Sequence, residues 1–133
     1  MNEALKLDNL KDYAQNVLKT EVDKNFLWAY TDGGPAFKSK NFILIFEEDQ
    51  LIINNLSMMG DFTGDFTVIP YRDLQEISYS TKLFGMAHEI KVVANGKTTK
   101  YKFAKKVLGA PWQFDNLDNI KEKGYLDQPS GAW

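Results

Sequence analysis

The sequence predicts a mainly β domain, α+β by helix content, with six or seven antiparallel strands between an N-terminal and a C-terminal helix. Apolar and aromatic runs recur from Phe26 to Phe103, turn residues separate them, and helical periodicity is confined to the two ends. The 133 residues, 44% hydrophobic and 26% charged, amount to one globular domain. We divide the chain into a helix over 1–22, a β domain over 23–124 and a tail over 125–133.

The composition bears on location and on several classes of site. There is no cysteine, which excludes disulfides, thiolate metal sites and a cysteine nucleophile. The N-terminus lacks the apolar core and cleavage site of a signal peptide, and no run approaches the roughly 18 apolar residues of a membrane span. We therefore expect a cytoplasmic protein.

The first helical pattern runs from Glu3 to Glu21. Apolar side chains recur there at spacings of three and four residues, at Leu7, Leu10, Ala14, Val17 and Leu18. This spacing predicts an amphipathic helix. Its apolar stripe is too short for a coiled coil, so we expect packing on its own domain, with an oligomerisation contact as the alternative.

Strand patterns begin with the aromatic-rich segment Phe26–Tyr30, which stops at the turn cluster Asp32–Pro35. Two continuous apolar runs, Phe42–Phe46 and Leu51–Ile53, are joined by four polar residues. They predict a hairpin whose two faces are both at least partly covered. The stretch 54–64 lacks alternation, and we expect a loop there with short extended pieces at most.

The chain is organised around the stretch from Phe66 to Phe103. Pro70 fixes its own φ and favours extended geometry before it, so it marks either the end of a strand or an unpaired position, and we expect a short turn or half-turn after it. Asn95 and Gly96 both tolerate the positive φ of a type I′ turn and predict a hairpin. Further strands are expected over 76–81, 86–94 and 98–103.

Period-two alternation sorts the side chains of this last hairpin between two faces. One face receives Met86, His88, Ile90, Val92, Thr99, Tyr101 and Phe103. The other receives Glu89, Lys91, Val93, Thr98, Lys100 and Lys102. We infer a core face of branched and aromatic residues and an outer face that is basic.

A second helix is predicted between Pro111, which suits a first turn, and Gly124, which suits an end. Its expected apolar side contains Trp112, Phe114, Leu117 and Ile120. The helix is the natural cover for an open side of the sheet. The tail from Tyr125 is expected to fray unless Trp133 docks.

Three segments resemble the bacterial pleckstrin-homology-like (PH-like) families over roughly residues 24–122. Phe42–Ile53 is similar to their strand, acidic turn and strand, and Ile69–Leu74 to their Ile-Pro-Tyr-x-x-Ile segment. The third segment is the Asn-Gly hairpin with its aromatic-tipped strand. The resemblance implies a half-open barrel plugged by the C-terminal helix, on a scaffold that hosts lipid, peptide and protein binding.

The resemblance also places lipid recognition in the first hairpin loop, here Tyr30–Asn41. That loop offers Lys38 and Lys40 but no arginine. Specific inositol phosphate recognition depends on bidentate guanidinium contacts, so the sequence weakens that expectation.

Charge is split along the chain, at minus six over 45–76 and plus six over 77–110. The candidate contacts for an anion or a partner are Lys91, Lys100, Lys102, Lys105, Lys106, Lys38 and Lys40. They could attract anionic headgroups at about 1 kcal/mol per lysine, or the acidic face of a second copy. The plainer interpretation is that lysines keep exposed strands soluble and discourage edge pairing.

Enzyme chemistry has little support. Any histidine-dependent site must use His88, which alternation places on the core face as a hydrogen-bonded structural residue. Gly96-Lys97-Thr98 is not a P-loop, because Lys91 stands where the first glycine is required. The paired carboxylates Glu47-Glu48 and Asp115 with Asp118 are expected to be solvated.

We therefore predict a non-catalytic PH-like interaction module without metal or cofactor, acting through protein contacts or self-association. Peripheral binding to anionic lipid through the lysine-rich sheet face is the alternative. A nucleic-acid partner is not expected at a pI near 5.4. A small apolar ligand remains open, although large side chains such as Phe42 and Tyr101 would fill a barrel interior.

Overall fold

Seven antiparallel strands form one sheet in the computed structural model, which describes residues 6–32, 40–82, 84–85, 87–104, 106–107 and 109–126. The strands are β1 (Phe26–Thr31), β2 (Lys40–Phe46), β3 (Gln50–Leu56), β4 (Phe62–Pro70), β5 (Leu74–Lys82), β6 (Ala87–Ala94) and β7 (Lys97–Phe103). The helical elements are α1 (Leu7–Tyr13), η2 (Ala14–Leu18), η3 (Tyr71–Asp73) and α2 (Gln113–Glu122).

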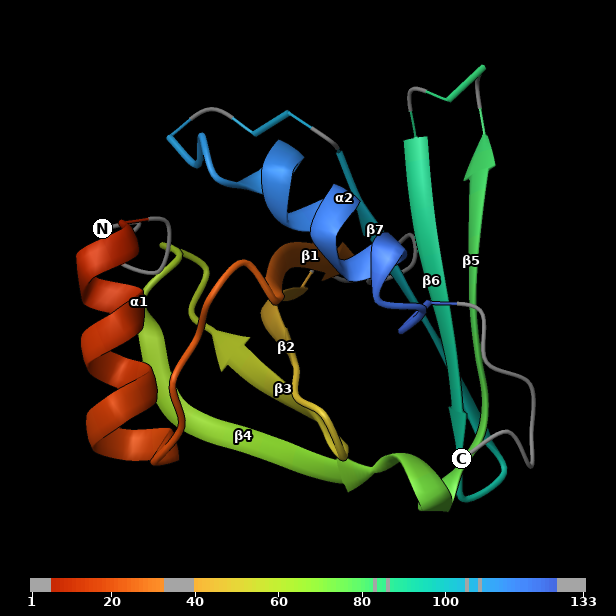
Figure 1. Cartoon of the computed structure of the whole chain (residues 1–133), viewed down its shortest axis with the longest axis horizontal. Helices are drawn as coiled ribbons and strands as arrows, with labels where there is room; N and C mark the ends of the chain where they lie inside the picture. The colour runs from red at the N-terminus through yellow and green to blue at the C-terminus, as the bar shows by residue number, and fades with distance from the viewer. Residues whose placement is uncertain are drawn as a thin grey trace.

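The strand order is β4-β3-β2-β1-β7-β6-β5. Figure 1 shows β5 and β6 standing upright at one side with β7 slanting down toward them, β2, β3 and β4 at the other side, and α2 between the two groups of strands. The predicted fold class is confirmed: a half-open antiparallel barrel of mainly β structure, with a helix at each end, consistent with a PH-like fold.

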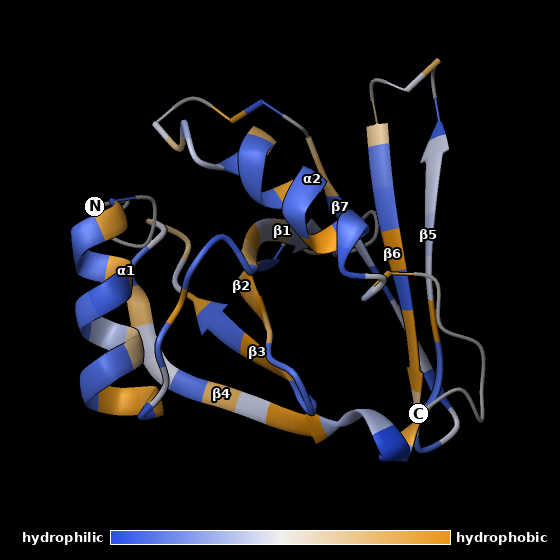
Figure 2. Ribbon diagram, viewed as in Figure 1, coloured by the Kyte–Doolittle hydropathy of each residue, from blue (hydrophilic) through white to orange (hydrophobic). Residues whose placement is uncertain are grey.

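The β2–β3 hairpin separates two hydrophobic cores, as its continuous apolar runs predicted. Leu44 and Phe46 face the interior of the barrel, while Ile43 and Ile45 face the layer that contains α1, and all four are fully buried. Figure 2 shows β2 as a largely hydrophobic strand, whereas α1 alternates between hydrophobic and hydrophilic residues.

The N-terminal helix packs on its own domain, as expected. Leu10 and Ala14 are fully buried, and Tyr13 stacks on Phe62 with ring centroids 4.0 Å apart. The described helix ends at Leu18, earlier than predicted. Val17 is 43% exposed because the last turn, η2, is π-helical and holds more residues per turn, which rotates the predicted stripe away from the sheet.

The loop predicted over 54–64 is confirmed only at its centre, because the strands on both sides extend further into this stretch than expected. β3 continues to Leu56 and β4 already begins at Phe62, and the turn between them is closed by a 2.9 Å bond from the Ser57 N–H to the Asp61 carbonyl. A register shift between Asn54 and Leu56 hid the pattern, because a β-bulge interrupts period-two alternation.

The centre of the chain is as predicted. β4 ends at Pro70, the short helix η3 follows, and Asn95 and Gly96 have φ values of 54° and 74°, as a type I′ turn requires. Tyr101 and Phe103 are buried, at 5% and 2% exposure.

Helix α2 covers the barrel, as predicted, through Leu117 and Ile120. The prediction for Phe114 is wrong, since it is 40% exposed while the polar Gln113 is fully buried. The tail does not fray at its first residues: Tyr125 stacks on Phe46, with centroids 6.0 Å apart, and Leu126 is 2% exposed. Trp133 lies outside the described residues.

Candidate binding groove at the open seam of the barrel

The two halves of the sheet meet where β1 faces β7, and we call this boundary the seam. β1 pairs with β2 along its whole length, from Phe26 to Thr31. Among the described residues it pairs with β7 at a single position, Tyr30 with Lys102. The seam therefore has a part beside Phe26–Trp28 and a part beside Lys97–Tyr101 in which the strands do not pair with each other.

At the Phe26–Trp28 end, side-chain amides of α2 close the seam. The Trp28 N–H donates to Gln113 Oε1 at 3.0 Å, and Gln113 Nε2 donates to the Trp28 carbonyl at 2.9 Å. Asn116 Nδ2 donates to the Phe26 carbonyl at 3.0 Å and Asn119 Nδ2 to the Lys24 carbonyl at 2.9 Å. Amides three residues apart on a helix thus serve alternate residues of the chain at β1.

The hydrophobic pattern did not indicate this closure, because α2 was interpreted only through its apolar residues. A polar signal was present: Gln113, Asn116 and Asn119 recur every three residues, which places them on neighbouring turns of one face. The sequence therefore shows a row of side-chain amides on one face of the helix. It does not show that their partner is the backbone of β1.

At the Lys97–Tyr101 end the seam is open and forms a groove of about 640 Å³. Its floor is apolar and comes from both halves of the sheet. Phe42 of β2 meets Tyr101 of β7 edge-to-face with centroids 5.2 Å apart, and Ile53, Ile69 and Val92 complete the floor. Burial raises the pKa of the Tyr101 phenol to about 12, so this hydroxyl stays protonated at neutral pH.

Lysines surround this floor. Lys40, Lys97 and Lys100 line the groove, are exposed, and form no ion pair with any residue that the structure describes. Lys102 also lines the groove, but it binds Asp32, whose carboxylate raises the pKa of the ammonium group. The groove thus combines an aromatic floor with three ammonium groups that have no ion-pair partner in the described part of the chain.

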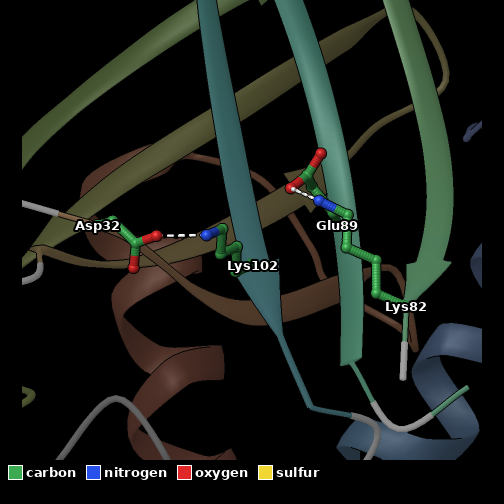
Figure 3. A network of polar contacts seen from close by, with 4 residues as sticks. All are labelled: Asp32, Lys82, Glu89 and Lys102. Atoms are coloured by element: carbon green, nitrogen blue, oxygen red, sulfur yellow. Dashed lines mark hydrogen bonds and ion pairs between the residues drawn. The ribbon is translucent and has the colours of Figure 1, made fainter. Parts of the chain in front are cut away.

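The outer face of β5–β7 is mixed in charge and not uniformly basic. Lys91 Nζ lies 2.9 Å from Glu76 Oε2, and this contact lowers the pKa of the Glu76 carboxyl. Lys82 Nζ lies 3.5 Å from Glu89 Oε2, whose side chain is only 10% exposed. Figure 3 shows this pair beside the contact between Lys102 and Asp32.

The structure brings some of the candidate lysines together and separates others. Lys40, Lys100 and Lys102 meet at the groove, whereas Lys91 lies on the outer face of β6 and Lys106 is exposed away from the groove. Lys38 and Lys105 lie outside the described residues. Sequence reasoning missed Lys97 as a site residue, although its place directly after the Asn-Gly turn marks it as the start of the returning strand.

The single histidine is structural in its surroundings, as predicted. His88 is 6% exposed, its Nδ1 lies 2.6 Å from the Tyr79 hydroxyl, and its ring stacks on Phe103 with centroids 5.2 Å apart. Asp115 and Asp118 are exposed on α2. No group of three or more potential metal ligands occurs within the described ranges.

Among the helices of the described chain, none combines the length and the hydropathy needed to cross a membrane.

No family model matches the chain, and no curated protein is similar to it in sequence. Among solved structures, one similar chain is the hSac2 domain from human phosphoinositide phosphatase Sac2, with a TM-score of 0.49 and 12% sequence identity. The similarity covers 87% of this chain and 76% of that one. We draw no functional conclusion from it.

Proposed function

We propose that the chain is a non-catalytic PH-like interaction module that binds a partner protein in the groove at the open end of the seam. One observation carries this proposal: the groove opens onto an apolar floor that includes Phe42 and Tyr101. Lys40, Lys97 and Lys100 surround this floor, are exposed, and form no ion pair with any described residue. Concave apolar sites with a few converging polar groups are typical of binding sites.

The ionisable groups of the groove support binding more than catalysis. The Asp32 carboxylate is held in an ion pair with Lys102, and the Tyr101 phenol stays protonated at neutral pH, so neither group is placed as a free general base. His88 and the Glu47-Glu48 pair do not line the groove. A partner that presents apolar side chains and carboxylates would match both the floor and the lysines around it.

The alternative, peripheral binding to anionic lipid through the sheet face, has weaker support. Two of the three lysines that defined this face, Lys91 and Lys102, are already in ion pairs with Glu76 and Asp32. Each pair cancels charge that would otherwise attract headgroups. Pelleting with vesicles of phosphatidylserine and phosphatidylcholine tests this alternative, which requires binding that Lys91→Glu abolishes.

The groove itself is tested by panning a displayed peptide library against the wild-type chain. Selected peptides should lose binding to Thr99→Trp, because residue 99 lies on the inner face of β7 and its indole would fill the groove. Thr81→Trp, the same substitution on exposed β5, should leave binding unchanged. Selected peptides that bind both variants equally would refute the groove as the site.

Self-association is the case in which the partner is a second copy. Light scattering behind a sizing column measures it directly. A mass above that of one chain, falling as salt is added, would support an association driven by the split charge. A monomer at high micromolar concentration, insensitive to salt, would leave a different protein as the partner.

A further inference from the structure

One wall of the groove is a strand edge, because β7 has no strand partner on its groove side along Lys97–Tyr101 among the described residues. β6 pairs with β7 on one side along the whole strand, from Lys97 to Phe103. On the other side, β1 reaches β7 only at Lys102 within the described residues. In an antiparallel strand every second residue turns its N–H and C=O away from a given neighbour, so part of the backbone of Lys97–Tyr101 faces the groove.

We propose that an extended acidic segment of a partner protein adds to this edge as an eighth strand. The inference rests on the proposed function and specifies how the groove is used and by what chemistry. Five residues of free edge extend about 17 Å at 3.3–3.4 Å per residue, enough for a short strand. Strand addition supplies main-chain hydrogen bonds, and alternate side chains supply specificity.

The register of β7 determines the side chains that such a strand needs. Thr99 and Tyr101 point toward the floor, whereas Thr98 and Lys100 point to the outer face, because successive side chains alternate. Side chains of an added strand alternate in the same way. Those facing inward meet the apolar floor with Phe42 and should be apolar, and those facing outward lie beside Lys100 and should be carboxylates.

Charge favours an acidic occupant at this edge in particular. Lys100 lies directly opposite Lys91 in the β6–β7 register, and like charges in this arrangement repel. Glu76 neutralises Lys91 but no described residue forms an ion pair with Lys100. A carboxylate on the open side of Lys100 would pair with it as Glu76 pairs with Lys91. Lys40 and Lys97, which also line the groove, would attract the same acidic segment.

Edge protection alone makes a different prediction. Lysines on an exposed strand discourage pairing with any other strand, and in that case no peptide should add to β7. The proposal instead requires selective addition, in which alternating acidic and apolar residues bind and neutral or basic strands do not.

The test uses the full chain and three capped eight-residue peptides: alternating glutamate and valine, the same residues in two blocks, and alternating lysine and valine. We expect the first to bind at least about tenfold more tightly than the others. In nuclear magnetic resonance, the alternating glutamate and valine peptide should slow hydrogen exchange at alternate amides of Lys97–Tyr101.

A pair of variants tests the role of Lys100. Lys100→Glu should weaken binding of this peptide about tenfold, whereas Lys106→Glu, which makes the same charge change at an exposed residue, should not.

The outcomes separate the two levels of the proposal. Equal binding of the alternating and block peptides, lost in Thr99→Trp but without protection of β7 amides, would overturn strand addition and keep the groove as the site. Binding that survives Thr99→Trp would overturn the groove. No binding of any of the three peptides, or binding of anionic vesicles alone, would overturn the acidic strand and leave edge protection or lipid contact as the role of these lysines.

Discussion

The two ends of the seam differ in how the backbone groups that face it are satisfied. Beside Phe26–Trp28, the backbone of β1 has no described strand partner on the side away from β2, and the buried amides of Gln113 and Asn116 bind it there. Beside Lys97–Tyr101, the backbone of β7 has no described strand partner on the side away from β6, and a groove faces it.

The difference follows from access to water. A buried N–H or C=O without a partner costs the full desolvation penalty of the group, so the end under α2 must be satisfied from within the chain. At the groove, solvent water can satisfy the same groups, and a ligand could take its place. Stability should therefore depend on the closed end of the seam, and binding should depend on the open end. Substitutions at the two ends test this difference.

The largest effect is expected from Gln113→Met. Methionine keeps the length of the side chain but leaves the Trp28 N–H and carbonyl unpaired under the helix. At about 1–3 kcal/mol for each of these two unsatisfied groups, the free energy of unfolding should fall by about 2–6 kcal/mol. Urea denaturation measures it, with the exposed Gln15→Met expected to change it by less than about 0.5 kcal/mol. If both variants were equally stable, apolar packing alone would close the seam.

The second prediction concerns the exclusion of water from the Tyr101 phenol in the floor of the groove. The pKa of Tyr101 rises from 10.0 to about 12 in the folded chain. A raised folded pKa contributes stability that is fully present below pH 10 and is lost as the pH rises toward 12. One pH unit above the unfolded value, at pH 11, the loss is about 1.4 kcal/mol.

Tyr101→Phe removes this titration. The decrease in the free energy of unfolding between pH 8 and pH 11 should therefore be smaller in the variant than in the wild type by about 1.4 kcal/mol. Urea denaturation at the two pH values measures the difference, and the other tyrosines cancel in the comparison. Identical pH dependence in the two proteins would mean that water reaches the phenol and that the floor is not dry.

The closed end and the open end also differ in how far the sequence predicts them. Alternation on β6 and β7 correctly placed Tyr101, Phe103 and His88 inside, and the Asn-Gly turn fixed the register of that hairpin, because both signals are local. The seam is not local. Gln113 and Trp28 are 85 residues apart, and nothing near either residue indicates the other.

The same limit applies to the charges. Period-two counting placed Lys91 and Lys102 correctly on the outer face. It could not show that Glu76 of β5 and Asp32, directly after β1, reach them. The prediction near Asn54 failed for a different reason. There the strands do pair, but the bulge interrupts the period-two pattern by which a strand is recognised in the sequence. Turns and faces were therefore predictable here, whereas partners across the sheet were not.

A smaller effect on stability is expected at the lysines of the open end. Lys97→Gln and Lys100→Gln should each change the free energy of unfolding by less than about 0.5 kcal/mol, because both side chains are exposed and unpaired among the described residues. Lys100→Gln should be slightly stabilising, since it removes the repulsion from Lys91 across the strand pair. Urea denaturation checks both, and a loss comparable to that of Gln113→Met would show that the groove is structural.

The smallest effect is expected from Glu76→Gln, which removes the partner of Lys91 on the outer face. Lys91 lowers the pKa of the Glu76 carboxyl, and a lowered folded pKa contributes stability that is present above the unfolded value and is lost as the pH falls through the folded one. The variant should therefore show a slightly weaker dependence of its melting temperature on pH below about 4.5. The exposed Glu48→Gln is the control.

Glu76→Gln also sharpens the comparison between the two ends of the seam. Without the carboxylate, the charge of Lys91 adds to that of Lys100, its cross-strand neighbour beside the open edge. If an acidic strand binds there, the alternating glutamate and valine peptide should bind about twofold more tightly to the variant, and this gain should shrink as salt is added. Weaker binding would mean that the peptide does not approach Lys100, and the open edge would then lose its role in recognition even though its backbone remains unpaired.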